Sequence, residues 1–285
     1  SNTALSEMSA NVNVALQIAR NLDRHLLSQD NSNVWVNTES TKQNYRSNFY
    51  RPYKQSLTMT QIGVANNVND NVRVGAVLSH SRANNTFAEN VSGKNRLTAL
   101  STYVKGNWNN GVFASLDLGY GRSRNTIDFD GKNNVFHRSL FSAGVNAGIQ
   151  WDWGVNVQPS IGVRYNRLSK ANYHLAEAKV ENKALNLMTY RAGLELSKTF
   201  DVAGVKLTPS VASYYNDATQ RKMAVNGALS VNNIGMQQQF GRYFNHEAGL
   251  AAQFNQWQVS AQVGMLKGSD ITTQKYAAFN LGYTW

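Results

Sequence analysis

The spacing of hydrophobic residues changes at about residue 30. Residues 4–28 contain neither Gly nor Pro, and their apolar side chains recur every three or four residues, at Leu5, Met8, Val12, Leu16, Ala19, Leu22 and Leu26. That spacing is typical of an amphipathic α-helix, and a helix of about 24 residues would be about 36 Å long. The sequence therefore predicts one long helix at the start of the chain.

From residue 31 onward the hydrophobic period is two. In residues 154–166 apolar side chains at odd positions alternate with polar or small ones such as Asn156, Gln158 and Arg164, and residues 110–121, 257–265 and 277–285 alternate in the same way. Such alternation predicts β-strands. Runs of this length exceed the strands of about five or six residues usual in soluble proteins, but match the about 9–11 residues of a tilted membrane strand.

The connections between these strands are of two kinds. Short turns rich in Asn, Asp or Gly lie near residues 69–71, 109–111, 152–154, 201–204 and 255–256. Longer polar stretches lie between them, and we expect loops at 40–55, 83–96, 123–137, 167–187, 216–238 and 267–274. Five turns and six loops connect twelve strands and put both barrel ends of the chain on the short-turn side, which is the asymmetry of outer-membrane barrels.

The tryptophans support a membrane setting. Five of them lie beside short turns or at the C-terminus, and Trp35 begins the first predicted strand; the five are Trp108, Trp151, Trp153, Trp257 and Trp285. All six on one level would form an aromatic girdle at a membrane interface. We therefore predict an all-β fold: a 12-stranded antiparallel transmembrane β-barrel (31–285) with the N-terminal helix (1–30) inside its lumen.

Composition limits the other fold classes. The 285 residues include no Cys, which excludes disulfide frameworks and thiolate metal sites. The mean hydropathy is −0.44, and no apolar run approaches the roughly 20 residues of a spanning helix. A membrane barrel stays possible, because lumen-facing residues keep its average hydropathy low. The start, Ser1-Asn2-Thr3, carries no secretory signal, so we expect a cytosolic, processed or partial chain.

We find no pattern of catalytic or metal-binding residues. The histidines are scattered, at His25, His80, His137, His174 and His246. Neighbouring strand residues such as His80 and Ser81 point to opposite faces and cannot easily pair. No nucleophile elbow or phosphate-binding loop occurs between a strand and a helix. We expect no catalytic residue, no metal and no cofactor in this chain.

The net charge of +11 raises the question of nucleic acid, but the basic residues are spread over strands and loops rather than gathered on one face. Arg73, Arg164 and Lys206 fall on the polar, lumen-facing phase of their strands, and Asp117 shares this wall. We therefore expect no nucleic-acid partner. Basic groups in the predicted loops could pair with anionic outer-leaflet lipid; these are Lys132, Lys170, Lys179 and Lys183.

The predicted helix carries polar residues that would face a polar barrel wall. They are Glu7, Asn11, Asn13, Gln17, Arg20, Asp23 and Arg24. A lumen of this width can hold a helix, and a helix just before the first strand can enter from the short-turn rim. The alternative is a disordered or amphipathic linker in the periplasm. Asp117 and Glu195 are acidic candidates to test for contact with the helix.

The last strand ends in alternating apolar residues that close on an aromatic C-terminus, at Phe279, Leu281, Tyr283 and Trp285. We interpret these four residues as a signal for the outer-membrane assembly machinery. The other interpretation is that any lipid-facing strand alternates in this way; the terminal aromatic residue favours the signal.

Together these features resemble the translocator domain of autotransporters (type V secretion), most of all the IgA-protease and adhesion-and-penetration group of serine protease autotransporters. The stretches that carry the likeness are ALSEMSA (4–10), TQIGV (60–64), VGAVL (74–78) and IGVRYNRL (161–168). The resemblance implies an outer-membrane barrel, with loops at the cell surface and both barrel termini on the periplasmic side. It would assist export of an N-terminal passenger and anchor it.

The resemblance also implies partners and processing. The partners would be outer-membrane lipid and lipopolysaccharide, the barrel-assembly machinery and the chain's own passenger, with the barrel as a monomer. The passenger would be a serine protease or an adhesin whose catalytic residues lie upstream, so that this chain itself is not an enzyme. Some members are cut at an Asn–Asn pair in the helix. Here Val12 separates Asn11 from Asn13, so we expect cleavage upstream, and these two residues are the candidates for in-barrel processing.

Two other functions stay open at this stage. A passive porin would require an open lumen, which the predicted helix opposes. An outer-membrane phospholipase or protease would require His, Ser and acidic groups that converge on one rim, and the sequence shows no such group.

Overall fold

The computed structural model describes residues 2–45, 52–88, 90–175, 177–218, 222–227, 230–237, 241–269 and 271–285, with side chains throughout except at 2–5, 88, 222–227 and 230–237. The side chain of Leu5, and a part of each predicted loop except 123–137, thus lie outside the described residues.

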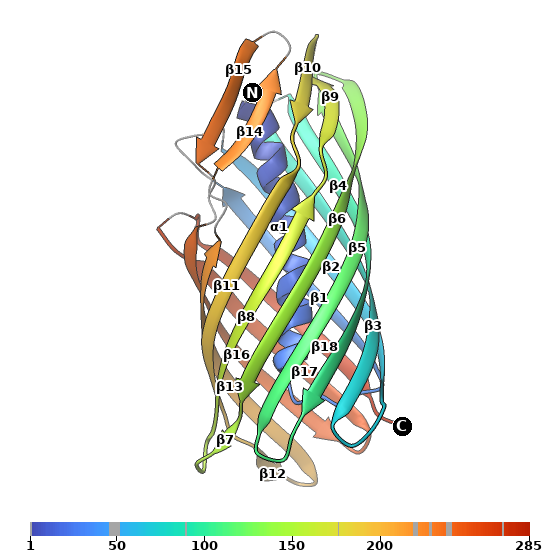
Figure 1. Ribbon diagram of the computed structural model, residues 1–285, viewed down its shortest axis with the longest axis vertical. Helices are drawn as coiled ribbons and strands as arrows, with labels where there is room; N and C mark the ends of the chain where they lie inside the picture. The colour runs from blue at the N-terminus through green and yellow to red at the C-terminus, as the bar shows by residue number, and fades with distance from the viewer. Residues whose placement is uncertain are drawn as a thin grey trace.

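Twelve long strands form a closed antiparallel barrel (Figure 1), which confirms the predicted fold. They are β1 (Val34–Tyr45), β2 (Tyr53–Asn67), β3 (Val72–Ala88), β4 (Val91–Asn107), β5 (Val112–Phe129), β6 (Lys132–Ile149), β8 (Asn156–Leu168), β11 (Leu185–Ser197), β13 (Val205–Ala218), β16 (Arg242–Phe254), β17 (Trp257–Lys267) and β18 (Gln274–Tyr283). The last strand pairs with the first, with Tyr283 opposite Val34. Closure pairs each long strand with two neighbours, as spanning a hydrocarbon layer requires.

The alternation of the sequence sorts side chains between the two barrel surfaces. On β5, Leu116 and Leu118 point outward and are about half exposed, whereas the alternating Ser115 and Asp117 are buried in the lumen. On β8, Ile161 and Val163 point outward and Arg164 points inward. The barrel therefore presents an apolar outer surface and a mostly polar inner one, as the period of two predicts.

The five short turns lie where the sequence predicts them, but most of the predicted loops are wrong. Strand β3 continues to Ala88 and β4 begins at Val91, while β5 continues to Phe129 and β6 begins at Lys132. All four strands therefore run through positions expected to be loop. Hairpin pairing satisfies backbone hydrogen bonds outside a bilayer as well as inside it, so a polar sequence does not end a strand.

Two of the predicted loops, 167–187 and 216–238, hold strands of their own. Strands β9 (Ala171–Leu175), β10 (Ala178–Asn182), β14 (Lys222–Gly227) and β15 (Ser230–Gln237) form a separate sheet in the order β15-β14-β10-β9. This loop-end sheet lies at the rim opposite the short turns (Figure 1). The short strands β7 (Trp151–Asp152) and β12 (Phe200–Val202) adjoin two short turns at the other rim.

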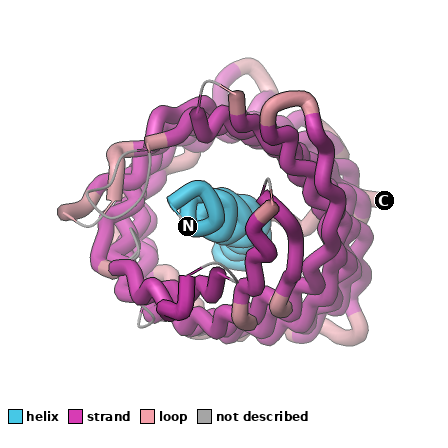
Figure 2. Tube along the Cα trace, turned by 90° about the horizontal axis from the view of Figure 1, so that it is seen from above, coloured by secondary structure: helices cyan, strands magenta, loops and turns pink. Residues whose placement is uncertain are grey.

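Helix α1 (Asn2–Leu27) runs through the barrel (Figure 2), with its N-terminal end near the loop-end sheet and its C-terminal end toward the short turns. Its apolar face packs in the lumen, where Met8, Val12 and Ile18 belong to one buried cluster with Leu57 and Ile127 of the wall. Within the described residues, no helix combines the length and hydropathy needed to span a membrane.

Five tryptophans are exposed on the outside, but the prediction for Trp35 is wrong. The side chain of Trp35 is buried in the lumen, where its ring stacks on His25 with 4.0 Å between ring centroids. Trp35 shares the inward phase of β1 with Asn37 and Glu39. Its indole covers Gly63 on β2, where a Cβ atom would lie 2.0 Å from the ring. The glycine thus makes room for an inward tryptophan.

Candidate functional site: the helix in the barrel lumen

The C-terminal half of α1 is held by two arginines that share acidic partners on the wall. Arg20 donates to both carboxylate oxygens of Glu39, at 3.1 and 2.6 Å. Arg24 donates to Glu247 at 2.6 Å and lies 3.5 Å from Glu39. The Glu39 side chain is fully buried, and those of Arg20 and Arg24 are 12% and 13% exposed. Because Glu39 lies on β1 and Glu247 on β16, these ion pairs connect the helix to two different strands of the wall.

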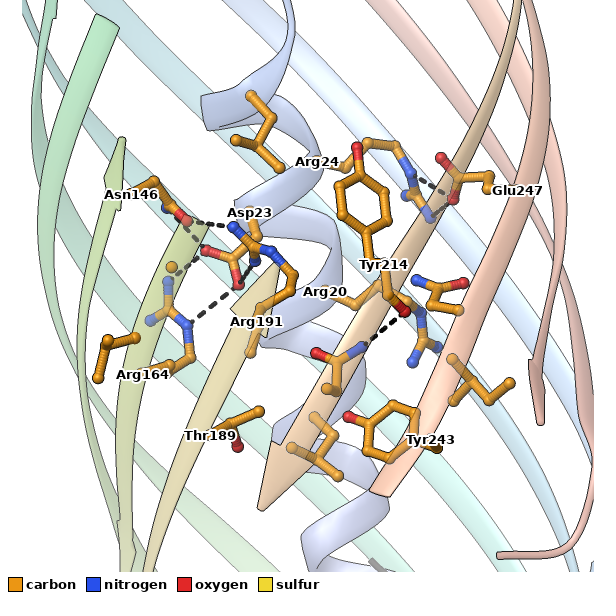
Figure 3. A pocket seen from close by; sticks show the side chains of 18 of the residues that line it. Arg20, Asp23, Arg24, Asn146, Arg164, Thr189, Arg191, Tyr214, Tyr243 and Glu247 are labelled. Atoms are coloured by element: carbon orange, nitrogen blue, oxygen red, sulfur yellow. Dashed lines mark hydrogen bonds and ion pairs between the residues drawn. The ribbon is translucent and has the colours of Figure 1, made fainter. Parts of the chain in front are cut away.

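Asp23 makes the opposite charge pairing with β8 and β11. Its carboxylate lies 2.7 Å from Arg164 and 3.1 Å from Arg191, and it accepts a hydrogen bond from Asn146 at 3.1 Å. Arg164 also pairs with Asp117 of the wall at 2.7 Å. Figure 3 shows the groups around Asp23 and around Arg24 on different sides of the helix. Two sets of opposite sign restrict its rotation.

The N-terminal half of α1 is held by a second buried set of polar groups. Glu7 pairs with Arg138 of β6 at 2.7 Å, and Asn182 of β10 donates to the same carboxylate oxygen at 3.2 Å. Asn11 receives a hydrogen bond from Asn95 of β4. Asn13 donates to the Tyr53 hydroxyl and to Gln55, both at 3.1 Å. Glu7 therefore joins the helix to the loop-end sheet as well as to the barrel.

At its C-terminal end the helix meets cationic and amide donors. The Leu27 carbonyl accepts from Gln158 at 2.9 Å, and the Ser28 carbonyl from Lys105 Nζ at 2.6 Å. Arg73 donates to the Asn31 carbonyl at 2.7 Å. The last carbonyls of a helix lack partners within the helix and carry partial negative charge. Lys105 and Arg73 thus stabilise the end of α1 and the bend into β1.

The space left in the lumen is small. A cavity between α1 and strands β8, β11, β13 and β16 has a volume of about 80 Å³, and one water needs ~10–15 Å³. Arg20, Asp23 and Arg191 line it (Figure 3). The cavity has room for a few waters but not for a polypeptide segment. The helix therefore occupies most of the described lumen.

The structure brings most of the predicted site residues together. On the helix these are Glu7, Asn11, Asn13, Arg20, Asp23 and Arg24, with Gln17 donating to the Glu39 carbonyl at 3.3 Å. On the wall, Arg73, Asp117 and Arg164 are buried. Lys206 lies apart: it is exposed at the short-turn rim, and among the described residues nothing pairs it with the helix. Among the described residues, Glu195 likewise forms no hydrogen bond or ion pair with the helix.

Sequence reasoning missed most of the wall partners. Glu39, Lys105, Arg138, Arg191 and Glu247 contact α1, its C-terminal end or Asp23. A signal for them was present, since each is charged and occurs within a long strand on its polar phase. The sequence alone does not show which residues meet across the lumen, because the partners are far apart in the chain. Arg138, for example, is 131 residues from Glu7.

At the C-terminus, Phe279, Leu281 and Trp285 are exposed on the outer surface, and the Tyr283 ring packs on Trp257 with 4.8 Å between centroids. In the described ranges, no group of three or more His, Asp or Glu residues is arranged to hold a metal ion.

Comparisons with known proteins fit this geometry. A family model for the autotransporter β-domain matches residues 34–264. The chain is 34% identical, over its full length, to the adhesion and penetration protein autotransporter of Haemophilus influenzae, and 30% identical, again over its full length, to an immunoglobulin A1 protease autotransporter of that species. It spans 20% and 15% of the length of these two relatives.

Among solved structures, the translocator domain of autotransporter NalP from Neisseria meningitidis superposes with a TM-score of 0.74. The match covers 98% of each chain at 14% sequence identity, so it supports the fold alone. The family model and the full-length relatives carry the assignment further: this chain belongs to the autotransporter β-domain family.

Proposed function

We propose that this chain is the outer-membrane translocator of a longer polypeptide, and that it assists export of an N-terminal passenger to the cell surface and anchors it. The observation that carries this proposal is the helix in the lumen. Its N-terminal end lies at the rim opposite the short turns, which we call the long-hairpin rim, and its C-terminal end leads into β1 near the short turns. A polypeptide continuous with the start of α1 would therefore stand outside the long-hairpin rim.

The orientation follows from the same asymmetry. Outer-membrane barrels have short turns toward the periplasm and longer connections toward the outside. Applied here, the hairpins and the loop-end sheet face the cell surface, and both barrel termini face the periplasm. In this proposal residues 1–30 are the linker and lumen helix, and residues 31–285 are the barrel.

The passenger belongs to the proposal as well. The two relatives are named for immunoglobulin A1 protease activity and for adhesion and penetration, and they extend far beyond the part that this chain matches. We propose a serine protease or adhesin passenger whose catalytic residues lie upstream of this translocator. We place its release upstream as well, because Val12 separates Asn11 from Asn13 and the Asn11 amide is directed at Glu7.

The remaining partners are the membrane and the assembly machinery. We propose that Phe279, Leu281, Tyr283 and Trp285 present the assembly signal to the barrel-assembly machinery. The apolar outer surface would contact outer-membrane lipid and lipopolysaccharide, with one chain per barrel. A passive porin is the second candidate, but the filled lumen opposes it.

The test is export of a reporter. A small folded reporter is placed ahead of residue 1, behind a secretory signal, and intact cells are treated with an added protease. We expect the reporter to be digested while periplasmic markers stay intact. The matched control carries the same reporter directly on residue 31, without the helix, and should leave it in the periplasm. A reporter that stays protected on a correctly folded, helix-containing barrel would contradict the proposal.

A further inference from the structure

Four arginines gather on the outer surface of the barrel, and the lumen contacts described above do not use them. They are Arg82 on β3, Arg96 on β4, and Arg122 and Arg124 on β5, and all four are exposed. We call them the outer arginine cluster. Arg96 lies directly opposite Arg82 on one neighbouring strand and opposite Arg124 on the other. The four side chains thus form one continuous group over three strands.

This arrangement is unfavourable unless an anion is present. Directly opposed side chains have Cβ atoms about 4.5–5.5 Å apart, and like charges so placed destabilise a sheet. Among the described residues, none of the four guanidinium groups forms an ion pair with a carboxylate, and Arg82 instead directs its Nε at His80, at 3.4 Å. In the lumen, by contrast, Arg20, Arg24 and Arg164 each have an acidic partner within 3 Å. The outer arginine cluster lacks a counter-ion within the described structure.

The height of the cluster indicates which anion would supply the charge. Between it and the short turns, the outer surface of the same strands is mostly apolar, with Leu78, Leu100, Leu118 and Tyr120 exposed. From Val112, just after a short turn, to Arg122 the strand would span about 34 Å, or about 26 Å along the axis of a barrel whose strands tilt by ~40°. Outer-membrane barrels have an apolar band about 25 Å tall. Arg122 therefore lies where the hydrocarbon ends and lipid headgroups begin.

From this position and charge we propose that the outer arginine cluster is a binding site for the phosphate groups of an anionic lipid of the outer leaflet, of the phosphorylated lipid A type. Guanidinium groups bind phosphate oxygens through paired, charge-assisted hydrogen bonds. Two phosphates between facing arginines would replace the repulsion with attraction. The inference rests on the proposed orientation, in which the long-hairpin rim faces the cell surface.

The binding test uses residues 1–285 purified in an uncharged detergent, with phosphorylated lipid A as the probe. The variant Arg82→Gln/Arg96→Gln/Arg124→Gln should bind it at least about tenfold more weakly, since each lost charge-assisted hydrogen bond contributes substantially. The control Lys42→Gln/Lys198→Gln/Lys267→Gln removes the same charge from exposed residues far apart along the chain, and should bind like the unmodified protein. Equal weakening of both variants would reduce the effect to net charge and overturn the site.

Two further probes identify the source of the phosphate. Lipid A from which the phosphates have been removed should bind weakly to the unmodified protein, and the arginine variant should not change that binding. Inorganic phosphate should fail to displace phosphorylated lipid A at comparable concentrations, because it lacks the acyl chains beside the apolar band. Displacement by inorganic phosphate would mean a free-anion site instead of a lipid site.

Thermal stability gives an independent readout that a merely structural role would not produce. Without lipid A, the arginine variant should unfold at a higher temperature than the unmodified chain, because repulsion has been removed. With lipid A, this order should reverse. A variant that is less stable in both conditions would show that the arginines support the barrel itself, against the proposal. These assays use purified protein, so their failure would be distinct from failure of the reporter to reach the cell surface.

Discussion

At the scale of single residues, the contact between helix and wall depends on opposite charges that meet across the lumen. Glu39 is the centre of one such group, because Arg20 binds both of its oxygens and Arg24 approaches one of them. A buried ion pair gains little over a well-packed apolar pair, but removal of one partner leaves the other charge uncompensated. These pairs therefore select one position of the helix, and their loss should let the helix move more freely in the lumen.

We expect Glu39→Gln to loosen the helix while the barrel stays folded. The substitution keeps the shape of the side chain but removes the charge that faces two guanidinium groups, and hydrogen bonds to charged groups contribute about 1.5–3 kcal/mol. In planar bilayers, the ratio of open to blocked time should rise by about tenfold or more, since ~1.4 kcal/mol corresponds to a factor of ten.

The matched control is Glu181→Gln on β10. Glu181 pairs with Lys179 at 3.1 Å, but both side chains are about half exposed, and exposed pairs contribute only about 0–1 kcal/mol. Its open-to-blocked ratio should equal that of the unmodified chain. If Glu39→Gln also left the ratio unchanged, the ion pairs in the middle of the lumen would not be what holds the helix.

At the scale of elements, α1 is an amphipathic helix buried on nearly all sides by a wall that is itself divided into polar and apolar regions. Its apolar residues pack on Leu57, Met59 and Leu140, and its polar residues meet the charged strands. The pattern that makes α1 too polar to cross lipid is thus the pattern that suits a barrel interior.

Removal of the helix should convert a blocked barrel into an open one. We expect residues 1–285 to give small or intermittent currents in planar bilayers, and a chain lacking residues 1–28 to give large and steady ones. The helix fills most of the lumen, and the cavity beside it holds only a few waters, so removal of the helix should open a path for ions. Equal, large currents from both chains would contradict the plug and favour a porin.

At the scale of the whole molecule, the closed barrel favours a monomer. The pairing of β1 with β18 leaves no strand edge in the barrel for a second copy to extend. The chain's own helix runs through the lumen (Figure 2), and the cavity beside it is too small for a segment of a neighbour. Each chain therefore satisfies its backbone and its lumen by itself.

We expect the purified chain to be monomeric in detergent. Light scattering combined with refractive-index and absorbance detection, which separates protein mass from bound detergent, should give the mass of one chain over a wide range of protein concentration. A mass of two or three chains that persists on dilution would contradict this expectation and would place an interface on the outer surface.

The architecture of the barrel and its helix follows from local sequence patterns. The period of two, the short turns and the period of three to four before residue 30 specify twelve strands and one helix, because each period reports which side chains share a surface of a local element. The same information placed Arg73, Asp117 and Arg164 in the lumen. It also placed the exposed tryptophans beside the short turns or at the C-terminus, since turn residues are recognised from the local sequence.

The remaining features arise only in the folded molecule, because they depend on residues far apart in the chain. Only closure brings Arg138 to Glu7 and Glu247 to Arg24, and only the glycine at position 63 on the neighbouring strand admits Trp35 to the lumen. The extent of the hairpins also depends on pairing between strands, which continues through polar sequence as long as each backbone group finds a partner. The outer arginine cluster is a similar case: its residues are spread along the sequence from 82 to 124, and strand register places them side by side.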